Sequence, residues 1–315
     1  MFSKYKYVFA VYKEQSFTQA AQKLFISQPS LSAAIKNIEN EVGAPLFERG
    51  GGKVKLTEIG KEYIVAAEQI MSAENDFKRK INDIYDLDFG SITVGGTNYL
   101  SSYVLPSIMS RFSSLHPKIE LNLVEANSRG LEKMVKDEQI DIVLDSFDDI
   151  SELYEGFPLV NERIFLCVPS SFEVNEKFKE YRIFPDIIRN GTKAAESIPT
   201  VPIEKFKDEN FILLKNGNDM YKRAMRIFEN HGITPKVLFS VDQLNISYAL
   251  VEMGMGLCFV TDTLIKYGGI HENVSFYKVG EEHCSRTLYI AYKKGRYCSR
   301  AMREFIETAR EFIDR

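Results

Sequence analysis

The chain has 315 residues, of which 44% are apolar and 27% are charged, and its formal net charge at pH 7 is −4. This composition is ordinary for a globular protein and leaves room for two or three domains. No apolar run approaches the roughly 20 residues that span a bilayer, and the N-terminus lacks the pattern of a signal peptide. We therefore expect a cytoplasmic protein that has no membrane partner and keeps its four scattered cysteines reduced.

Charge is distributed unevenly along the chain. Residues 1–60 contain eight lysines and arginines against five acidic residues, a net of +3, so the remainder of the chain sums to −7. A small basic segment attached to a larger acidic body fits a nucleic-acid-binding domain followed by a second domain.

The first 45 residues are predicted to form three helices. Spacings of three and four indicate the first helix, with apolar residues at Tyr5, Val8, Phe9 and Tyr12. Ser16 is expected to cap the second helix, in which Ala20 and Ala21 permit close packing. The third helix starts at Ser27 and stops at Gly43. Two short helices joined by a tight turn are the helix-turn-helix pattern.

The polar side of the third predicted helix has no acidic residue over its first three turns. Before Glu39 it presents hydroxyls, an amide and a lysine, from Gln28, Ser30, Ser32 and Lys36. Short donors and a base are the composition expected of a helix that lies against phosphates and base edges. Residues 46–57 then fit two short strands around three glycines, a basic hairpin that contains Arg49, Lys53 and Lys55. The alternative is a small helical bundle with a solvated basic loop.

These segments together resemble the N-terminal domain of LysR-type transcriptional regulators. The matching residues are Ala20-Ala21, the run from Ser27 to Ser32, Ile35, Glu39, Gly43, Leu46-Phe47-Arg49, Leu56-Thr57 and Gly60. The resemblance implies a winged helix-turn-helix at residues 1–58 that binds double-stranded DNA. It assigns the major groove to Gln28, Pro29, Ser30, Ser32 and Lys36, and phosphates or the neighbouring minor groove to Arg49, Lys53 and Lys55. Ala33-Ala34 replace a usual Arg-Gln pair, so Lys36 and the wing are expected to contribute more.

One long helix is predicted to follow, over residues 59–87, with Thr57 as its cap. Its apolar positions recur at steps of three and four over many turns, which indicates a stripe that packs against another helix. We predict a dimer seam at Ile59, Tyr63, Ile70, Phe77 and Ile81. The alternative is packing against the C-terminal part of the same chain. The resemblance implies that two such helices pair, giving a dimer or tetramer.

The remainder, residues 88–315, alternates short apolar strands with helices. Strands at Ile92–Val94, Glu120–Val124 and Ile142–Leu144 are separated by helical runs, so parallel pairing is expected. A similar alternation follows Arg163. The whole therefore reads as an α/β fold in which this part resembles the two-lobed type 2 periplasmic-binding proteins, the ligand-sensing half of LysR-type regulators. Lobe I is predicted at 88–161 and 269–315, and lobe II at 162–268.

Polar residues gather where predicted strands lead into helices. Free backbone N–H groups at such junctions attract polar and anionic ligands. The candidate effector residues are Thr97, Asn98, Ser101, Ser102, Asn127, Ser128, Asn218 and Asp242. Each one alone is equally well a cap or a turn residue. A small molecule with a carboxylate or similar polar group would suit these donors. The long segment at residues 176–202 is expected to add a helix over the cleft or an interface.

Other functions fit the sequence less well. The four histidines share no ligand or triad spacing, and no hydrolase, metalloprotease or nucleotide-binding signature occurs, so we expect no catalytic residue, metal or cofactor. A transport-binding protein would need an export signal, and an architectural DNA binder would leave two-thirds of the chain without a role. The prediction is an effector-responsive LysR-type regulator whose ligand changes oligomer geometry on promoter DNA, with RNA polymerase as a further candidate partner.

Overall fold

The computed structural model describes residues 4–48, 54–84, 90–147, 150–189, 195, 197–269, 273–279 and 284–313. The chain divides into two compact units, Met1–Ile81 and Asn82–Arg315. In these described ranges, no helix combines the length and the apolar character required to cross a membrane.

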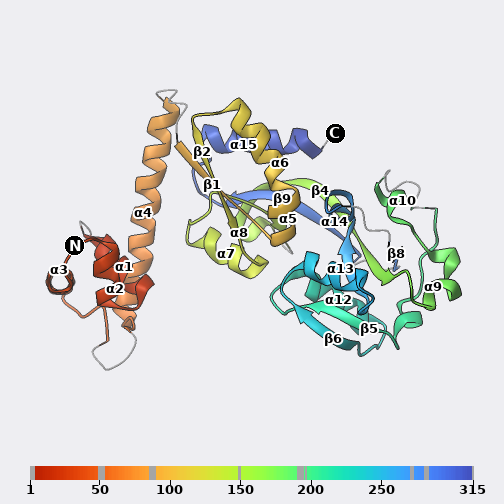
Figure 1. The fold of residues 1–315 in the computed structure, drawn as a ribbon. Coiled ribbons are helices and arrows are strands. Elements are labelled where there is room, and N and C mark those ends of the chain that lie inside the picture. Colours follow the sequence, from red (N-terminus) through yellow and green to blue (C-terminus); the bar gives the residue numbers. More distant parts are fainter. Residues whose placement is uncertain are drawn as a thin grey trace. The chain divides into compact units, whose positions relative to one another are not determined.

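The first unit holds helices α1 (Tyr5–Glu14), α2 (Phe17–Lys23), α3 (Gln28–Val42) and most of α4 (Glu58–Ile84) (Figure 1). The predicted caps are confirmed, because Ser16 and Ser27 accept the backbone N–H groups of Gln19 and Ser30, each at 3.3 Å. Gly43 ends α3 with a φ of +83°, a left-handed conformation that favours glycine.

One hydrophobic core fills the first unit. Ala20 and Ala21 of α2 are buried in it, as their small side chains predicted. Helix α4 contributes Tyr63, Ile64 and Ala67 to the same core. The first turns of α4 are therefore a structural part of this domain rather than a separate linker.

A close contact fixes the start of α4 against the end of α3. The carboxylate of Glu39 accepts the backbone N–H of Leu46 at 2.7 Å, and Thr57 Oγ1 accepts that of Gly60 at 2.9 Å. A Cβ atom at Gly60 would lie 2.0 Å from the carbonyl oxygen of Leu46. The contact therefore requires glycine at position 60.

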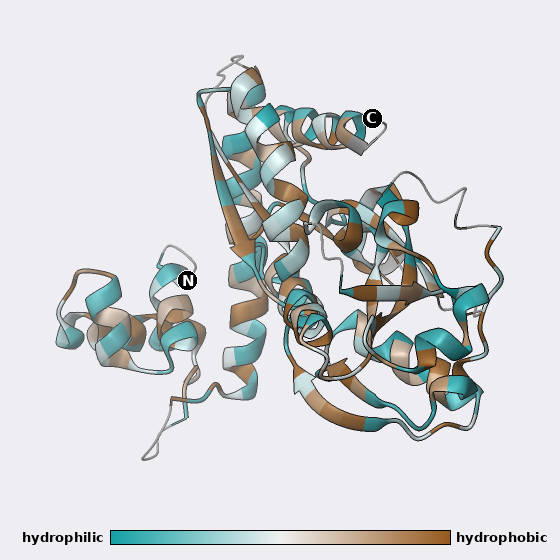
Figure 2. Ribbon diagram, turned by 45° about the vertical axis from the view of Figure 1, so that its right-hand side comes forward, coloured by the Kyte–Doolittle hydropathy of each residue, from teal (hydrophilic) through white to brown (hydrophobic). Residues whose placement is uncertain are grey.

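The predicted dimer seam on α4 has two different environments. Tyr63 is only 5% exposed and packs in the core of its own domain, so its assignment to the seam is wrong: the first turns of α4 turn this face inward. Ile70 is half-buried against the same core. Ile59 and Phe77 are exposed, and Ile81 is half-buried. In Figure 2, hydrophobic and hydrophilic residues accordingly alternate along α4.

The second unit contains a mixed sheet in the order β2-β1-β3-β9-β4-β7, with β8 paired to β4 beside this path (Figure 1). Parallel pairing of β1 with β2 and with β3 confirms the prediction, whereas β9 runs antiparallel to β3 and β4. A separate pair of parallel strands is formed by β5 and β6. The strands are β1 (Gly90–Gly96), β2 (Ile119–Glu125), β3 (Ile142–Ser146), β4 (Tyr154–Pro169), β5 (Asn210–Leu214), β6 (Lys236–Val241), β7 (Cys258–Thr261), β8 (Val274–Tyr277) and β9 (Ser285–Lys293).

Helices cover these strands on their flanks. They are α5 (Asn98–Tyr103), α6 (Leu105–Leu115), α7 (Ser128–Lys136), α8 (Ile150–Leu153), α9 (Val174–Lys177), α10 (Pro185–Arg189), α12 (Asp219–Asn230), α13 (Leu244–Glu252), α14 (Asp262–Tyr267) and α15 (Arg300–Ile313), with short 3₁₀ turns η1 (Lys179–Tyr181) and η2 (Ile203–Phe206). Strands β3, β7 and β8 are buried along their whole length. Figure 2 shows hydrophobic residues concentrated on the strands.

Strand β4 joins the two lobes. Its first part, from Tyr154 to Arg163, pairs with β9, and its second part, from Ile164 to Pro169, pairs with β7 and β8. Strand β8, which the sequence placed in lobe I, therefore belongs with lobe II. The reason is the length of β4, which has 16 residues. It begins in lobe I and ends in lobe II, and β8 pairs with the end that lies in lobe II.

The described part of segment 176–202 packs along β8. The N–H of Ile183 donates to the carbonyl of Phe276 at 2.8 Å, and that of Val201 donates to Lys278 at 2.8 Å. Short helical turns connect these contacts. Residues 190–194 and 196 lie outside the described ranges.

Candidate nucleic-acid interface and ligand cavity

The N-terminal end of α3 carries an exposed polar surface. Gln28, Pro29, Ser30 and Lys36 are exposed, and Ser32 is half-buried. The amide of Gln28 donates to Ser32 Oγ at 2.9 Å, and the hydroxyls of Ser27 and Ser30 lie 2.7 Å apart. These hydrogen bonds hold the side chains in one arrangement while leaving acceptors and donors open to a partner.

The charge of this surface is positive. Lys36 forms no ion pair with a described residue, and the first carboxylate of α3, at Glu39, is turned toward the backbone N–H of Leu46. At the base of the wing, Phe47 and Leu56 form an antiparallel bridge and the N–H of Glu48 donates to the carbonyl of Lys55 at 2.9 Å. In the described residues of this segment the pairing is an isolated bridge, and the predicted hairpin of residues 49–53 lies outside the described residues.

Of the predicted wing cations, Lys55 is exposed beside this bridge. Arg49 and Lys53 lie outside the described residues. Phe25, in the turn between α2 and α3, is not among the predicted contacts, yet it is 96% exposed and has a φ of +56°. An aromatic residue in the turn, two residues before the Ser27 cap, was the available signal.

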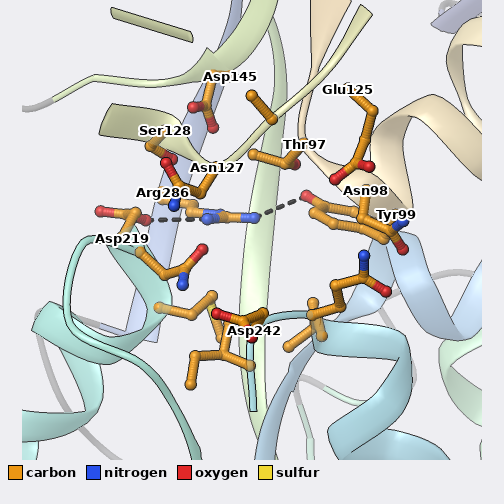
Figure 3. A pocket seen from close by; sticks show the side chains of 16 residues that line it. Thr97, Asn98, Tyr99, Glu125, Asn127, Ser128, Asp145, Asp219, Asp242 and Arg286 are labelled. Atoms are coloured by element: carbon orange, nitrogen blue, oxygen red, sulfur yellow. Dashed lines mark hydrogen bonds and ion pairs between the residues drawn. The ribbon is translucent and has the colours of Figure 1, made fainter. Parts of the chain in front are cut away.

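A cavity of about 250 Å³ lies between the two lobes of the second unit (Figure 3). Helices α5, α7, α12 and α13 all start at its wall, which follows from the way strands and helices alternate in both lobes. The lining residues are Thr97, Asn98, Tyr99, Glu125, Ala126, Asn127, Ser128, Asp145, Leu214, Asn218, Asp219, Met220, Asp242, Gln243, Leu244 and Arg286.

Most of the predicted effector residues meet at this cavity. Thr97, Asn98, Asn127, Ser128, Asn218 and Asp242 line it. Ser101 and Ser102 do not line it, because α5 starts at Asn98 and carries both past the opening. The hydroxyl of Ser101 is buried and donates to the carbonyl of Gly96 at 3.1 Å, and Ser102 is exposed to solvent. Segment 176–202 does not line the cavity in its described part.

A buried charge cluster centred on Arg286 forms one wall. Its guanidinium donates to Glu162 at 2.6 Å, to Asp219 at 2.9 Å and to the hydroxyl of Tyr99 at 2.6 Å. Tyr99 in turn donates to Glu162 at 2.8 Å. Figure 3 shows Arg286 between Asp219 and Tyr99. The cluster ties both crossing strands, β4 and β9, to one helix from each lobe.

The sequence could not reveal this cluster. Glu162 and Arg286 are 124 residues apart, yet they face each other in the register of β4 and β9. A charged residue within each apolar strand was the only signal.

The two aspartates of the cavity wall have opposite pKa shifts. Burial raises the pKa of Asp145 to about 6, because the hydrogen bond from Ser128 and the charge of Arg286 offset the loss of water only in part. Burial alone would also raise the pKa of Asp219, but Arg286 and Arg223 lower it to about 2. Asp219 is thus held in its ionised form by two arginines, whereas Asp145 is a buried carboxylate that forms no ion pair with a described residue.

Metal binding finds no support in the residues that the structure describes, since no three or more histidine, cysteine, aspartate or glutamate side chains gather there in a way that could hold an ion.

Comparison with known proteins identifies both units. Residues 2–61 match the family described as bacterial regulatory helix-turn-helix protein, lysR family, and residues 86–314 match the LysR substrate binding domain. YcgK of Bacillus subtilis (strain 168), named as an uncharacterized HTH-type transcriptional regulator, is 30% identical over 98% of this chain and 93% of its own length. A probable RuBisCO transcriptional regulator of Thalassiosira pseudonana is 28% identical over 93% of this chain and 91% of its own.

Solved structures share the fold over the full length. Full-length OxyR from Pseudomonas aeruginosa superposes with a TM-score of 0.66 at 18% identity, covering 98% of this chain and 94% of that one. Full-length CbnR in complex with its target DNA gives 0.62 at 18% identity and covers 99% of both chains. The matches over both units together show that this chain belongs to the LysR family: it is a DNA-binding transcriptional regulator with a winged helix-turn-helix domain and a C-terminal effector-binding domain.

Proposed function

We propose that the N-terminal end of α3 reads the operator in the major groove. Gln28, Pro29, Ser30 and Ser32 approach the base edges, and Lys36 approaches the phosphates. The observation that carries this assignment is the absence of any carboxylate on the first three turns of an exposed helix. Arg49, Lys53 and Lys55 of the wing contact phosphates or the adjacent minor groove, adding to affinity more than to sequence preference.

The protein acts as a homodimer or tetramer assembled through α4. An apolar stripe on α4 is partly exposed to solvent in the single chain and consists of Ile59, Phe77 and Ile81. Ile70 joins this stripe at the edge of the domain core. Pairing two chains places two α3 helices over one dyad-symmetric site, which is how helix-turn-helix dimers read successive turns of DNA.

A small-molecule effector binds in the cavity between the lobes. Thr97, Asn98, Asn127 and Ser128 contact it from lobe I, whereas Asn218 and Asp242 contact it from lobe II. A ligand that touches both lobes favours one relative orientation of them. This orientation changes oligomer geometry and DNA bending, and with them the contact with RNA polymerase. No catalytic step is part of this role.

The DNA-binding surface is tested by Ser30→Glu, with Asn40→Glu as the matched control. Both changes add one carboxylate to an exposed position of α3, about 15 Å apart along its axis. Operator fragments are first selected from genomic DNA with the wild-type protein, and affinity is then measured by fluorescence anisotropy at several salt concentrations. Ser30→Glu should weaken binding by about 1–3 kcal/mol or more, and Asn40→Glu should leave it near wild type. Equal affinities for both variants would refute the assignment.

The effector's role is tested separately on the same operator fragment. A compound that stabilises the wild-type protein against heat should change the distance between dyes at the two ends of the DNA, as energy transfer measures. A bound ligand that leaves both the bend and the oligomer unchanged would contradict the proposed mechanism.

A further inference from the structure

The cavity wall carries more carboxylates than available cations. Glu125, Asp145, Asp219 and Asp242 reach it from β2, β3, α12 and the loop before α13, and Arg286 is the single cation among its lining residues. In Figure 3 these carboxylates surround the opening from several sides. Two of these carboxylates are paired with cations outside the lining, Asp242 with Lys215 at 2.7 Å and Asp219 with Arg223 at 2.8 Å. Glu125 and Asp145 are therefore the wall carboxylates that form no ion pair with a described residue.

Arg286 is not offered to a ligand. Its side chain is 4% exposed, and its charge is balanced by Glu162 and Asp219 at 2.6 and 2.9 Å. An effector carboxylate could reach this guanidinium only by displacing one of those buried partners. The cation that commonly recognises a ligand carboxylate is thus already used within the protein.

Two acceptors at the cavity have no hydrogen-bond donor among the described residues, and a third, Asp145, has donors but no ion pair. Glu125 is exposed to the cavity and forms no hydrogen bond or ion pair with a described residue. Asp145 is 2% exposed and accepts hydrogen bonds from the N–H of Ser146 and from Ser128, with no ion pair. The side-chain oxygen of Asn98 is buried without a donor among the described residues. A buried acceptor without a donor, such as the Asn98 oxygen, is rare in folded proteins. Together with the two carboxylates that form no ion pair with a described residue, it points to a ligand that brings N–H groups.

The helix starts do not reverse this balance. Each carries about half a positive charge, but Asn127 already caps α7 by accepting the N–H of Gly130 at 2.8 Å. Asp219 occupies the first turn of α12 and neutralises it. The partial positive charge that remains at the N-termini of α5 and α13 is smaller than the full negative charges of Glu125 and Asp145.

We propose that the effector carries one or more protonated amine groups, whose N–H donors are accepted by Glu125 or Asp145 on the lobe I side of the cavity. The proposal rests on the proposed function, in which this cavity is the effector site. Ammonium and amidinium groups both meet its chemistry, since each brings a charge and several N–H donors. The volume of about 250 Å³ accommodates about eight water-sized groups. The sequence predicted an effector with a carboxylate, because only the serine, threonine and asparagine donors were considered. In the structure, Glu125 and Asp145 also line the cavity.

The test uses four compounds on one five-carbon skeleton and the full-length protein. They are 1,5-diaminopentane, 5-aminopentanoate, glutarate and 1,5-pentanediol, and calorimetric titration measures their affinities up to about 10 mM. The amine-bearing compounds should bind about tenfold or more tightly than glutarate. Glu125→Gln and Asp145→Asn should each weaken amine binding about tenfold, whereas Glu120→Gln, on the same strand but outside the cavity, should not.

Three results would overturn the proposal: tighter binding of glutarate, no binding of either amine, or amine affinity that survives both Glu125→Gln and Asp145→Asn. Thr97→Ala distinguishes a wrong ligand class from a wrong location of the effector site. If glutarate binds and Thr97→Ala weakens it, the cavity is the effector site and only the ligand class is wrong. If neither Thr97→Ala nor Glu125→Gln affects any bound compound, the cavity assignment itself fails.

A separate observation concerns Phe25 in the turn before α3. The N–H groups of Phe25 and Ile26 donate to the carbonyls of Gln22 and Ala21 at 3.1 and 3.0 Å, the pattern that closes a helix through a left-handed residue. Glycine or asparagine normally takes that position. A phenylalanine there is strained, and at 96% exposure it gains nothing from the core.

We infer that Phe25 contacts the DNA beside α3, by apolar contact with a sugar or a thymine methyl group. Its place supports this, since it stands two residues before the Ser27 cap, at the end of α3 where Gln28 and Ser30 are exposed. Strain held at an exposed site points to function there.

Phe25→Asn tests this contact, because asparagine suits the left-handed backbone. Thermal stability should be equal or higher, operator affinity should fall about fivefold, and the salt dependence should stay unchanged since no phosphate contact is lost. Lys36→Ala is the contrasting variant and should lower the slope of log affinity against log salt by about 0.9. Wild-type affinity of Phe25→Asn, or a fall accompanied by lost stability, would remove Phe25 from the interface.

Discussion

Replacing Asp145 by asparagine should stabilise the effector-binding domain at neutral pH and leave it unchanged in acid. The pKa of this carboxyl is 3.8 in an ordinary setting and about 6 in the folded protein, where burial disfavours its charge. At 1.36 kcal/mol for each pKa unit, ionising Asp145 costs the folded state about 3 kcal/mol. Asparagine keeps the shape and an oxygen that accepts the N–H of Ser146, but it carries no charge to bury.

The sign follows from where each state binds its proton. Below about pH 4 the carboxyl is protonated in both states and contributes no pH dependence. Between about pH 4 and 6 the unfolded chain releases the proton and the folded chain keeps it, so stability falls as pH rises. Above pH 6 both states are ionised and the full cost applies. The gain of Asp145→Asn should therefore appear across that interval and reach about 3 kcal/mol above it.

Urea unfolding at pH 4 and at pH 7.5 measures this difference. Because the chain has no tryptophan, far-UV circular dichroism is the suitable signal. Asp208→Asn, whose side chain is 82% exposed, serves as control and should stay within about 0.5 kcal/mol of wild type. A variant that gains nothing at pH 7.5, or gains equally at both pH values, would refute the reasoning. If the gain is found together with lost amine binding, Asp145 trades stability for ligand recognition.

Three further variants test the packing on which the function depends. Arg286→Leu leaves the buried carboxylate of Glu162 without its cation and should cost about 3–5 kcal/mol; a loss below about 1 kcal/mol in urea unfolding would show that the cluster is not needed. Gly60→Ala forces a Cβ against the carbonyl of Leu46 and should lower the melting temperature of the DNA-binding domain, at about 1–3 kcal/mol; an unchanged thermogram would contradict the tight contact. The double change Phe77→Asp and Ile81→Asp should give monomers in light scattering, and an intact oligomer would exclude this seam.

Local features of the first domain were predictable from the sequence, because short-range chemistry decides them. The serine caps, the glycine that ends α3 and the apolar spacings act within one or two turns of helix. The seam was harder to assign. One apolar stripe on α4 serves two neighbours, first its own domain at Tyr63 and then open surface at Phe77, and spacing alone does not mark the change.

The ligand cavity was predictable only in part, for a related reason. Strand-to-helix junctions placed Thr97, Asn127 and Asn218 correctly at its wall, since each junction is local in sequence. The charged residues of the cavity wall were not predictable in this way. Glu162 and Arg286, for example, are brought together by the register of two strands that are distant in sequence. Ser101 and Ser102 do not line the cavity because α5 already starts at Asn98 and carries both serines past the opening, and the sequence did not mark this helix start.

The course of β4 and β9 also governs the order in which the chain can fold during synthesis. The sheet of lobe I includes β9, which is synthesised only after the whole of lobe II. Lobe II is therefore an insertion whose two ends meet as neighbours at Glu162 and Arg286. Its strands and helices are complete in sequence before β9 is made, so the inserted lobe is the first that can close. In lobe I, β3 and the first part of β4 lack their common partner β9 until then, a delay that nascent-chain proteolysis would register as late protection of β1–β3.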